Sequence, residues 1–198
     1  MPPSSEIRPV AHASPATQPE YSQEERTLLL RLAHDAIVSA VEQQGLPDVP
    51  YSEHLSQPRG AFTTLYLHAK LRGCVGYPLP VAPLYRTIIE TARAAAFQDP
   101  RFAPVSRKES SELQVSLSVL STMQPILPDQ IEVGRHGLLM SHAGHRGLLL
   151  PQVAIEHGWD RLTFLEQTCL KAGLPLNAWR EARIEAFTAE VFAADGCE

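Results

Sequence analysis

The sequence contains little cysteine and no long apolar run. Three cysteines, Cys74, Cys169 and Cys197, occur among 198 residues, and none belongs to a CxxC pair. A secreted disulfide scaffold would have more cysteines in an even number, and zinc ribbons and thioredoxin-type sites need paired ones. No run approaches the roughly 20 apolar residues that span a membrane, and we find no signal-peptide pattern. We therefore expect a soluble cytoplasmic protein with reduced thiols.

The sequence also lacks an excess of positive charge. Lysine and arginine number 17 against 22 acidic residues, which gives a formal net charge of −5. Binding to nucleic acid or to an anionic membrane needs a basic surface, and no basic run or basic helix supplies one. Neither a GxGxxG sequence nor a Walker sequence is present. These absences disfavour nucleic-acid binding, membrane association and a phosphate-binding loop.

The composition changes after the first 20 residues. Residues 1–20 are rich in Pro, Ser and Ala and show no periodicity, so we predict a flexible tail there. The remaining length suits one compact domain, which we place at residues 21–193, followed by a short tail at 194–198.

Periodicity predicts helices mixed with hairpins. Ser22 and Glu25 form a capping-box pattern for a helix that should stop at Gly45. Residues 81–97 predict a second helix, and residues 151–159 and 160–173 two more. Strands are expected at 59–67, 71–76 and 114–121, in a hairpin turning at Ala143–Gly144, and in one alternating stretch at 183–192. Hairpins interspersed with helices favour an α+β fold.

The stretch "KLRGCVGYPLP" places a thiol between two glycines. Strand alternation would put Lys70, Arg72 and Cys74 on one face, with Leu71 and Val75 on the other. Cys74 is therefore expected to point with the charged residues toward a polar environment.

Two interpretations of this thiol stay open. In the first, Arg72 lowers the thiol pKa, and the backbone N–H groups of Gly73 and Gly76 bind a negatively charged substrate. In the second, Cys74 is a small buried side chain, the glycines serve strand packing, and Arg72 pairs with Asp99 or another carboxylate.

The sequence "FQDPRF" at 97–102 follows a predicted helix. Pro100 biases Asp99 away from helical backbone, which predicts a loop. Asp99 and Arg101 could orient a polar substrate, or Asp99 could fix Arg72. For Phe102 we favour insertion into the core.

The histidines offer one weak candidate for a base. If His136 in "GRHG" came close to Cys74, it could take the thiol proton. His142 and His145 are better explained by a solvated turn, and with His157 they match no metal-ligand spacing, so no metal site is predicted. Four further residues are expected to be structural or exposed: Cys169, Trp159 and Trp179 in packing, and Cys197 at the surface.

Several motifs, in order, resemble the AMMECR domain, whose bacterial and archaeal members are called AmmeMemoRadiSam system protein A. They are "LRGCVG" (71–76), "DPRF.PV" (99–105), "LQVSLSVL" (113–120), "VGRHGL" (133–138) and "LLLPQVAIEHGWDRLTFLEQTCLKAGLP" (148–175), within a match from about Tyr21 to Phe192. One small departure is Val75, where the signature more often has isoleucine.

The resemblance implies an α+β domain with a large helix-flanked sheet, mainly antiparallel, and a smaller second lobe across a cleft. It also implies association with a Memo-like protein and a radical SAM protein, and it brings no established activity, substrate or cofactor. Two hypotheses follow. The chain either binds or transforms a small anionic substrate at Cys74 with Arg72, or it is a non-catalytic module that docks those partners.

Overall fold

The computed structural model describes residues 19–45 and 52–193. The predicted tails therefore lie outside the described residues, except for the last two residues of the 1–20 segment. Glu20 of that segment donates its backbone N–H to the Glu190 carboxylate at 2.7 Å. The described chain thus begins at a point fixed to a strand far along the sequence.

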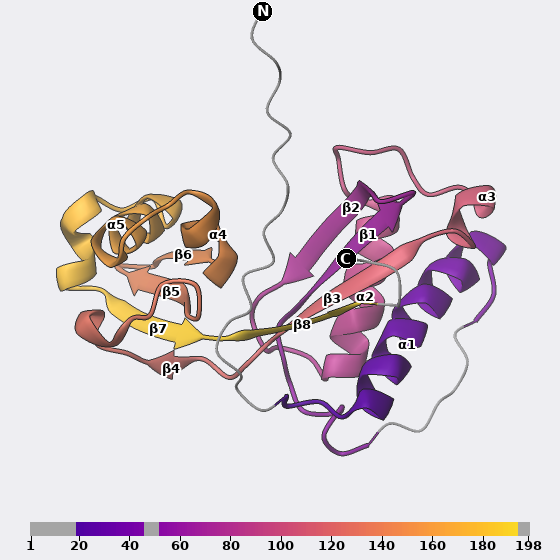
Figure 1. Cartoon of the computed structure of the whole chain (residues 1–198), viewed down its shortest axis with the longest axis horizontal. Coiled ribbons are helices and arrows are strands. Elements are labelled where there is room, and N and C mark those ends of the chain that lie inside the picture. The colour runs from indigo at the N-terminus through magenta and orange to yellow at the C-terminus, as the bar shows by residue number, and fades with distance from the viewer. Residues whose placement is uncertain (1–18, 46–51, 194–198) are drawn as a thin grey trace, which may run out of the picture.

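Two four-stranded antiparallel sheets form the framework, and they lie side by side (Figure 1). The first has the order β2-β1-β3-β8 and the second the order β4-β7-β5-β6. Their strands are β1 (Ala61–Leu67), β2 (Lys70–Tyr77), β3 (Gln114–Leu120), β4 (Gln124–Pro125), β5 (Gly137–His142), β6 (His145–Leu149), β7 (Arg183–Phe187) and β8 (Ala189–Ala193). The predicted α+β class is confirmed.

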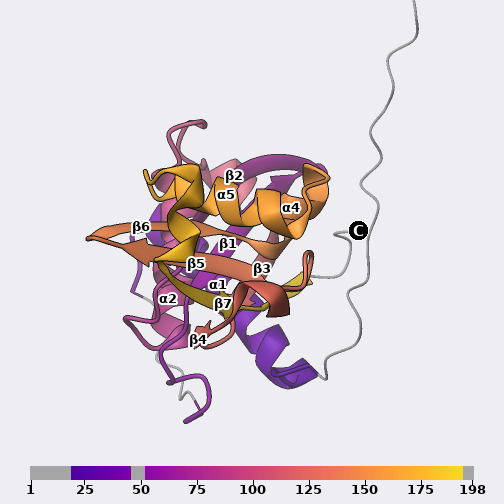
Figure 2. The ribbon, with the colours of Figure 1, turned by 90° about the vertical axis from the view of Figure 1, so that its left-hand side faces the viewer.

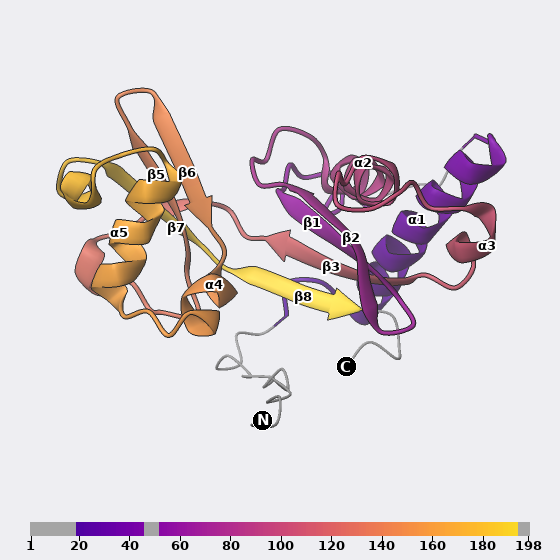
Figure 3. The same ribbon diagram turned by 90° about the horizontal axis from the view of Figure 1, so that it is seen from above.

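Helices α1 (Gln23–Glu42) and α2 (Leu84–Phe97) lie on one side of the first sheet (Figure 3). The predicted capping box of α1 is present, since the Ser22 side chain and Glu25 bond to each other's backbone N–H groups. The helix does not run to Gly45. It ends at Glu42 because Gln43 adopts the left-handed conformation, with φ 57°.

The core of this larger lobe lies between the two helices and the sheet. Leu84, Ile88, Ala92 and Ala95 of α2 are at most 1% exposed, as their helical spacing predicted. Burying one leucine or isoleucine side chain contributes about 1.5–3 kcal/mol. On β3, the residues Val115, Leu117 and Val119 are buried, while the serines between them are only half-buried.

The smaller lobe places α4 (Pro151–Glu156) and α5 (Arg161–Lys171) on one face of the second sheet (Figure 2). Cys169 of α5 is fully buried in this core, and Trp159 and Trp179 pack at its border, as predicted. Two 3-10 helices, η1 (Pro128–Gln130) and η2 (Leu176–Arg180), complete the lobe.

The stretch 183–192 is two strands in two different sheets, and not one strand. β7 pairs with β5 in the second sheet, Thr188 follows, and β8 pairs with β3 in the first. The alternating pattern continues through Thr188, but it carries no information about which sheet each half joins. The link from β3 to β4 passes beside this point, since the Ser121 N–H donates to the Thr188 carbonyl at 2.9 Å.

The predicted hairpin turns are present. His68 and Ala69 join β1 to β2, and Ala143 and Gly144 join β5 to β6, all with positive φ. The loop after α2 contains one short helix, α3 (Arg107–Ser110). Within residues 19–45 and 52–193, no helix combines the length and the apolar character needed to cross a membrane.

The end of α1 yields a stability prediction. Glycine adopts the left-handed conformation without the steric cost that Gln43 bears, so Gln43→Gly should raise the free energy of unfolding by about 0.5–1 kcal/mol in urea denaturation. The neighbouring substitution Gln44→Gly is the control, because no positive φ occurs there. Equal stabilisation by both variants would contradict the explanation.

Candidate functional site

The strand that carries the thiol contains a bulge. In the β1–β2 register Leu65 pairs with Gly73 and Tyr66 with Leu71, which leaves Arg72 as the extra residue. A bulge shifts the alternation of faces by one residue. The predicted grouping of Lys70 with Cys74 and of Leu71 with Val75 is therefore wrong, and Leu71 is 42% exposed.

Cys74 lies on the face of the first sheet turned away from α1 and α2. Its partner Thr64 stands between Thr63 and Leu65, whose side chains are fully buried toward the helices, so Thr64 and Cys74 face the other way. The Thr64 hydroxyl donates to Cys74 Sγ at 3.3 Å. We call this face the open face, formed by Phe62, Thr64, Cys74, Ser116, Ser118 and Val191. Cys74 is half-buried as a residue.

The Asp99 carboxylate holds the backbone beside the thiol. β2 is an edge strand, and the Cys74 N–H donates to Asp99 Oδ2 at 2.9 Å. The same carboxylate accepts from Arg101 Nη2 at 2.7 Å, from its Nε at 3.0 Å and from its backbone N–H at 3.1 Å. Asp99 is only 5% exposed. These bonds, the Arg101 side-chain bonds first, hold the pKa of Asp99 well below its usual range.

Arg72 binds a carboxylate, but not Asp99. Its Nε donates to Glu109 Oε1 at 3.0 Å, and its Nη2 donates to the Ala103 carbonyl at 2.9 Å. The hydrogen bonds from Arg72, followed by those from Ser106, lower the pKa of Glu109 to about 2. The guanidinium that was expected to favour the thiolate is thus neutralised by an α3 glutamate.

Phe102 is not inserted in the core. The Arg72 guanidinium lies 5.9 Å from the Phe102 ring centroid and the Arg101 guanidinium 5.5 Å from it. The ring is half-buried beside both cations, because the bulge directs Arg72 toward the 99–103 loop instead of along the strand face. Cation–π contact of this kind contributes about 0.5–1 kcal/mol at exposed sites.

The two glycines have packing roles in this structure. A Cβ on Gly73 would lie 2.2 Å from the Ala95 carbonyl oxygen, so glycine permits α2 to approach β2. A Cβ on Gly76 would overlap the Phe62 ring, which covers it. Neither glycine presents an uncovered surface like the one predicted for anion binding.

His136 lies in the smaller lobe, and no described contact joins it to Cys74. It directly precedes β5, whose first residue Gly137 pairs with Phe187. Phe187 is adjacent to Thr188, so His136 is at the end of the lobe nearest the connection to the first sheet. Its Nδ1 accepts the Glu132 N–H at 3.1 Å. Burial lowers the pKa of His136, Glu132 raises it by less, and Arg135 lowers it slightly further. A neutral ring whose Nδ1 accepts a hydrogen bond carries its proton on Nε2. Nε2 is therefore a hydrogen-bond donor and cannot act as a base.

His142 and His145 belong to a hairpin turn, which they flank as expected. Across the described ranges, no group of three or more His, Cys, Asp or Glu side chains is arranged to hold a metal ion.

Two residues of the thiol's surroundings were missed in the sequence. Thr64 is on the other strand of the hairpin from Cys74. Counting residues outward from the His68–Ala69 turn identifies Thr64 as the partner of Cys74 only if the bulge is taken into account. Glu109 had a visible signal, since Ser106 and Glu109 form a capping box. Nothing in the sequence indicates that its carboxylate reaches β2.

Comparison with known proteins agrees with the α+β architecture of the chain. The chain matches the AMMECR1 family over residues 30–192. It is 41% identical over 176 residues to a protein of Aquifex aeolicus, covering 83% of this chain and 90% of that one. It is 42% identical over 179 residues to a protein of Thermococcus kodakarensis, covering 83% and 87%.

A solved structure shares the fold. The crystal structure of an uncharacterised protein from Pyrococcus horikoshii superposes with a TM-score of 0.71 at 38% identity, covering 85% of this chain and 90% of that chain. The chain belongs to the AMMECR1 family. None of these three relatives carries a name that states an activity.

The Arg72–Glu109 pair yields a pH prediction. The folded pKa of Glu109 is below the unfolded value of 4.5, so its ionisation stabilises the fold above pH 4.5, and this contribution is lost as the pH falls toward 2. Glu109→Gln should lower the free energy of unfolding by about 1 kcal/mol at pH 7. The difference from the native chain should shrink steadily below pH 4.5 in urea denaturation.

Glu156→Gln serves as the control for this series. Glu156 forms no ion pair within the described part of the chain, so its substitution should leave stability within about 0.5 kcal/mol at every pH. A gap between native and Glu109→Gln proteins that stays constant down to pH 2 would rule out the ion pair as its cause.

Proposed function

We propose that this AMMECR1-family chain binds a small anionic molecule at Cys74 and that the thiol takes part in its transformation. The observation that supports this is the position of the half-buried Cys74 on the open face, with a half-exposed arginine, Arg101, held at the strand edge beside it. In this proposal the chain works in the cytoplasm, where thiols stay reduced. It acts as an enzyme or as the subunit of one.

Arg101, and not Arg72, is the cation that the proposal assigns to the ligand. The Arg72 side chain is 13% exposed and bonded to Glu109, whereas the Arg101 side chain is 55% exposed. Asp99 and the Cys74 carbonyl engage Nε and Nη2 of Arg101. A guanidinium has five N–H donors, so those of Nη1 remain for an anion. Asp99 orients this side chain while it offsets part of the charge.

The chemistry proposed for Cys74 is nucleophilic. The sulfur bonds to an electrophilic carbon of the ligand, the leaving group departs with the bonding electron pair, and the thiol proton passes to water. The Thr64 hydroxyl at 3.3 Å orients the sulfur. His136 enters this proposal only as a donor through Nε2, since its Nδ1 is already an acceptor.

Alkylation with two reagents of different charge tests the anion site directly. Iodoacetate and iodoacetamide attack the same sulfur, but only iodoacetate is negatively charged. We expect the alkylation rate of Cys74 by iodoacetate, divided by its rate with iodoacetamide, to be several-fold higher in the folded chain than in urea. Both rates are measured by peptide mass spectrometry. Arg101→Gln should return the ratio to the unfolded value, because the nearby positive charge is lost.

Two controls are built into the chain. Arg107→Gln removes a 78% exposed arginine that pairs with Glu42 near the end of α1, and it should leave the ratio unchanged. Cys169 is fully buried, with a pKa raised by burial, and should react only after unfolding. If Cys74 is as unreactive as Cys169 in the folded protein, the proposal fails.

A second candidate function is docking of partner proteins by the open face. Val191 of β8 is 61% exposed on this face, beside Ser118 and one strand further from Phe62. Exposed apolar surface on a sheet that no described helix of the lobe covers is typical of an interaction site. We propose a Memo-like protein and a radical SAM protein as the partners, on the basis of the family resemblance alone.

Charge placed on the open face tests this second function. Val191→Glu should abolish co-purification with the Memo-like and radical SAM proteins of the same genome, because a buried carboxylate is costly to desolvate. Val81→Glu is the matched control, since Val81 is 81% exposed outside this face. Docking that survives Val191→Glu would exclude the open face as the interface.

A further inference from the structure

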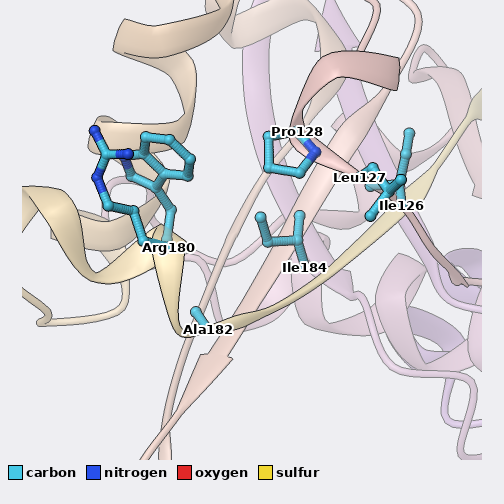
Figure 4. Close-up of a pocket in the computed structure, with 7 residues that line it drawn as sticks. Ile126, Leu127, Pro128, Arg180, Ala182 and Ile184 are labelled. Carbon is cyan, nitrogen blue, oxygen red and sulfur yellow. The ribbon is translucent and has the colours of Figure 1, made fainter.

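The smaller lobe contains a groove that the proposed function does not use. It has a volume of about 420 Å³ and lies between η1, η2 and the start of β7 (Figure 4). We call it the Trp179 groove, and its lining residues are Ile126, Leu127, Pro128, Trp179, Arg180, Ala182 and Ile184. The groove is in the smaller lobe and Cys74 is in the larger one, so binding in the groove can be tested independently of the thiol site.

Five of the seven lining residues are aliphatic, and polar atoms contribute about half of the exposed lining surface. Pro128 and Ile184 face the space from opposite elements, and Leu127 borders it (Figure 4). Leu127 is 60% exposed, while Ile184 is 6% exposed and belongs to the lobe's core. The groove therefore has a fixed apolar floor and an exposed apolar rim, and covering the rim removes apolar surface from water at about 25 cal/mol per Å².

Arg180 supplies the single charge of the lining. Its guanidinium carbon lies 4.3 Å from the centroid of the Trp179 ring, within the distance of a cation–π contact. A cation–π contact pairs no N–H donor with an acceptor oxygen, so the guanidinium donors remain available to bind a ligand. Within the described ranges no carboxylate lies within 4.0 Å of it and no hydrogen bond engages it, whereas Arg183 nearby is bonded to Glu185 at 2.8 Å.

We infer that the Trp179 groove binds a small anionic molecule with a flat apolar body, such as an aromatic carboxylate. The ring of the ligand lies against Leu127, Pro128 and Ile184, and its carboxylate accepts hydrogen bonds from the edge of the Arg180 guanidinium. The volume falls in the range of small-molecule sites, and one oriented cation in an apolar lining is their usual composition. A bidentate arginine–carboxylate contact fixes the ligand's direction in the groove.

Titration with 2-naphthoate, followed by ¹H–¹⁵N NMR, tests the inference. The chain has two tryptophans, so it gives two indole N–H signals, and Trp159→Phe assigns them. We expect saturable shifts of the Trp179 signal and none of the Trp159 signal. Arg180→Gln should weaken binding about tenfold, the effect of losing a charge-assisted hydrogen bond.

Two comparisons make the result decisive. Neutral 2-naphthylmethanol should bind at least tenfold more weakly than 2-naphthoate, and Arg183→Gln should bind 2-naphthoate like the native chain, because Arg183 is already paired. Equal binding of the neutral compound, or equal weakening by both arginine substitutions, would overturn the anionic specificity. Shifts that do not saturate would show that the groove holds no small molecule and that its exposed rim has another role.

Discussion

The Asp99 carboxylate is the interaction on which the thiol's surroundings depend. One nearly buried group accepts the Cys74 N–H and three N–H groups of Arg101, and so joins the loop after α2 to the edge of the first sheet. An edge strand with unpaired N–H groups invites pairing with other chains. Asp99 occupies the N–H of Cys74 and leaves its side chain accessible on the open face.

The charges around this carboxylate are arranged in pairs. Asp99 holds Arg101, Glu109 holds Arg72, and the two guanidinium groups approach one Phe102 ring. Their positive charge is largely offset locally, so any anion bound here must rely on directed N–H groups more than on net charge. The Trp179 groove shows the opposite arrangement, a single unpaired cation against an apolar lining.

Sequence periodicity predicted the elements of this protein well where one face of each is buried. The α2 stripe and the alternation of β3 correspond directly to buried residues, because burial itself imposes those periods. The bulge at Arg72 and the left-handed Gln43 were not predictable, since both depend on local backbone geometry that neither residue type requires. The assignment of β7 and β8 to separate sheets depends on tertiary pairing alone.

The candidate site was predictable only in part. Alternation indicated correctly that Cys74 opposes Val75 and points away from the core, since both residues follow the bulge. Arg72 pairs with a carboxylate, as one interpretation expected, but the choice of Glu109 over Asp99 was not predictable, because a sequence gives no distance between a strand and a distant loop. The packing roles of Gly73 and Gly76 likewise depend on Ala95 and Phe62, which only the folded chain brings close.

The shared use of residues 183–193 has a consequence for the order of folding. β7 lies between β4 and β5 in the second sheet, and β8 completes the first, where Glu190 also bonds to Arg26 and to the Glu20 N–H. Neither sheet is complete until this segment, which follows the other described strands in the sequence, has paired. The two sheets are therefore completed by the same segment, and until it pairs both lobes expose strand edges.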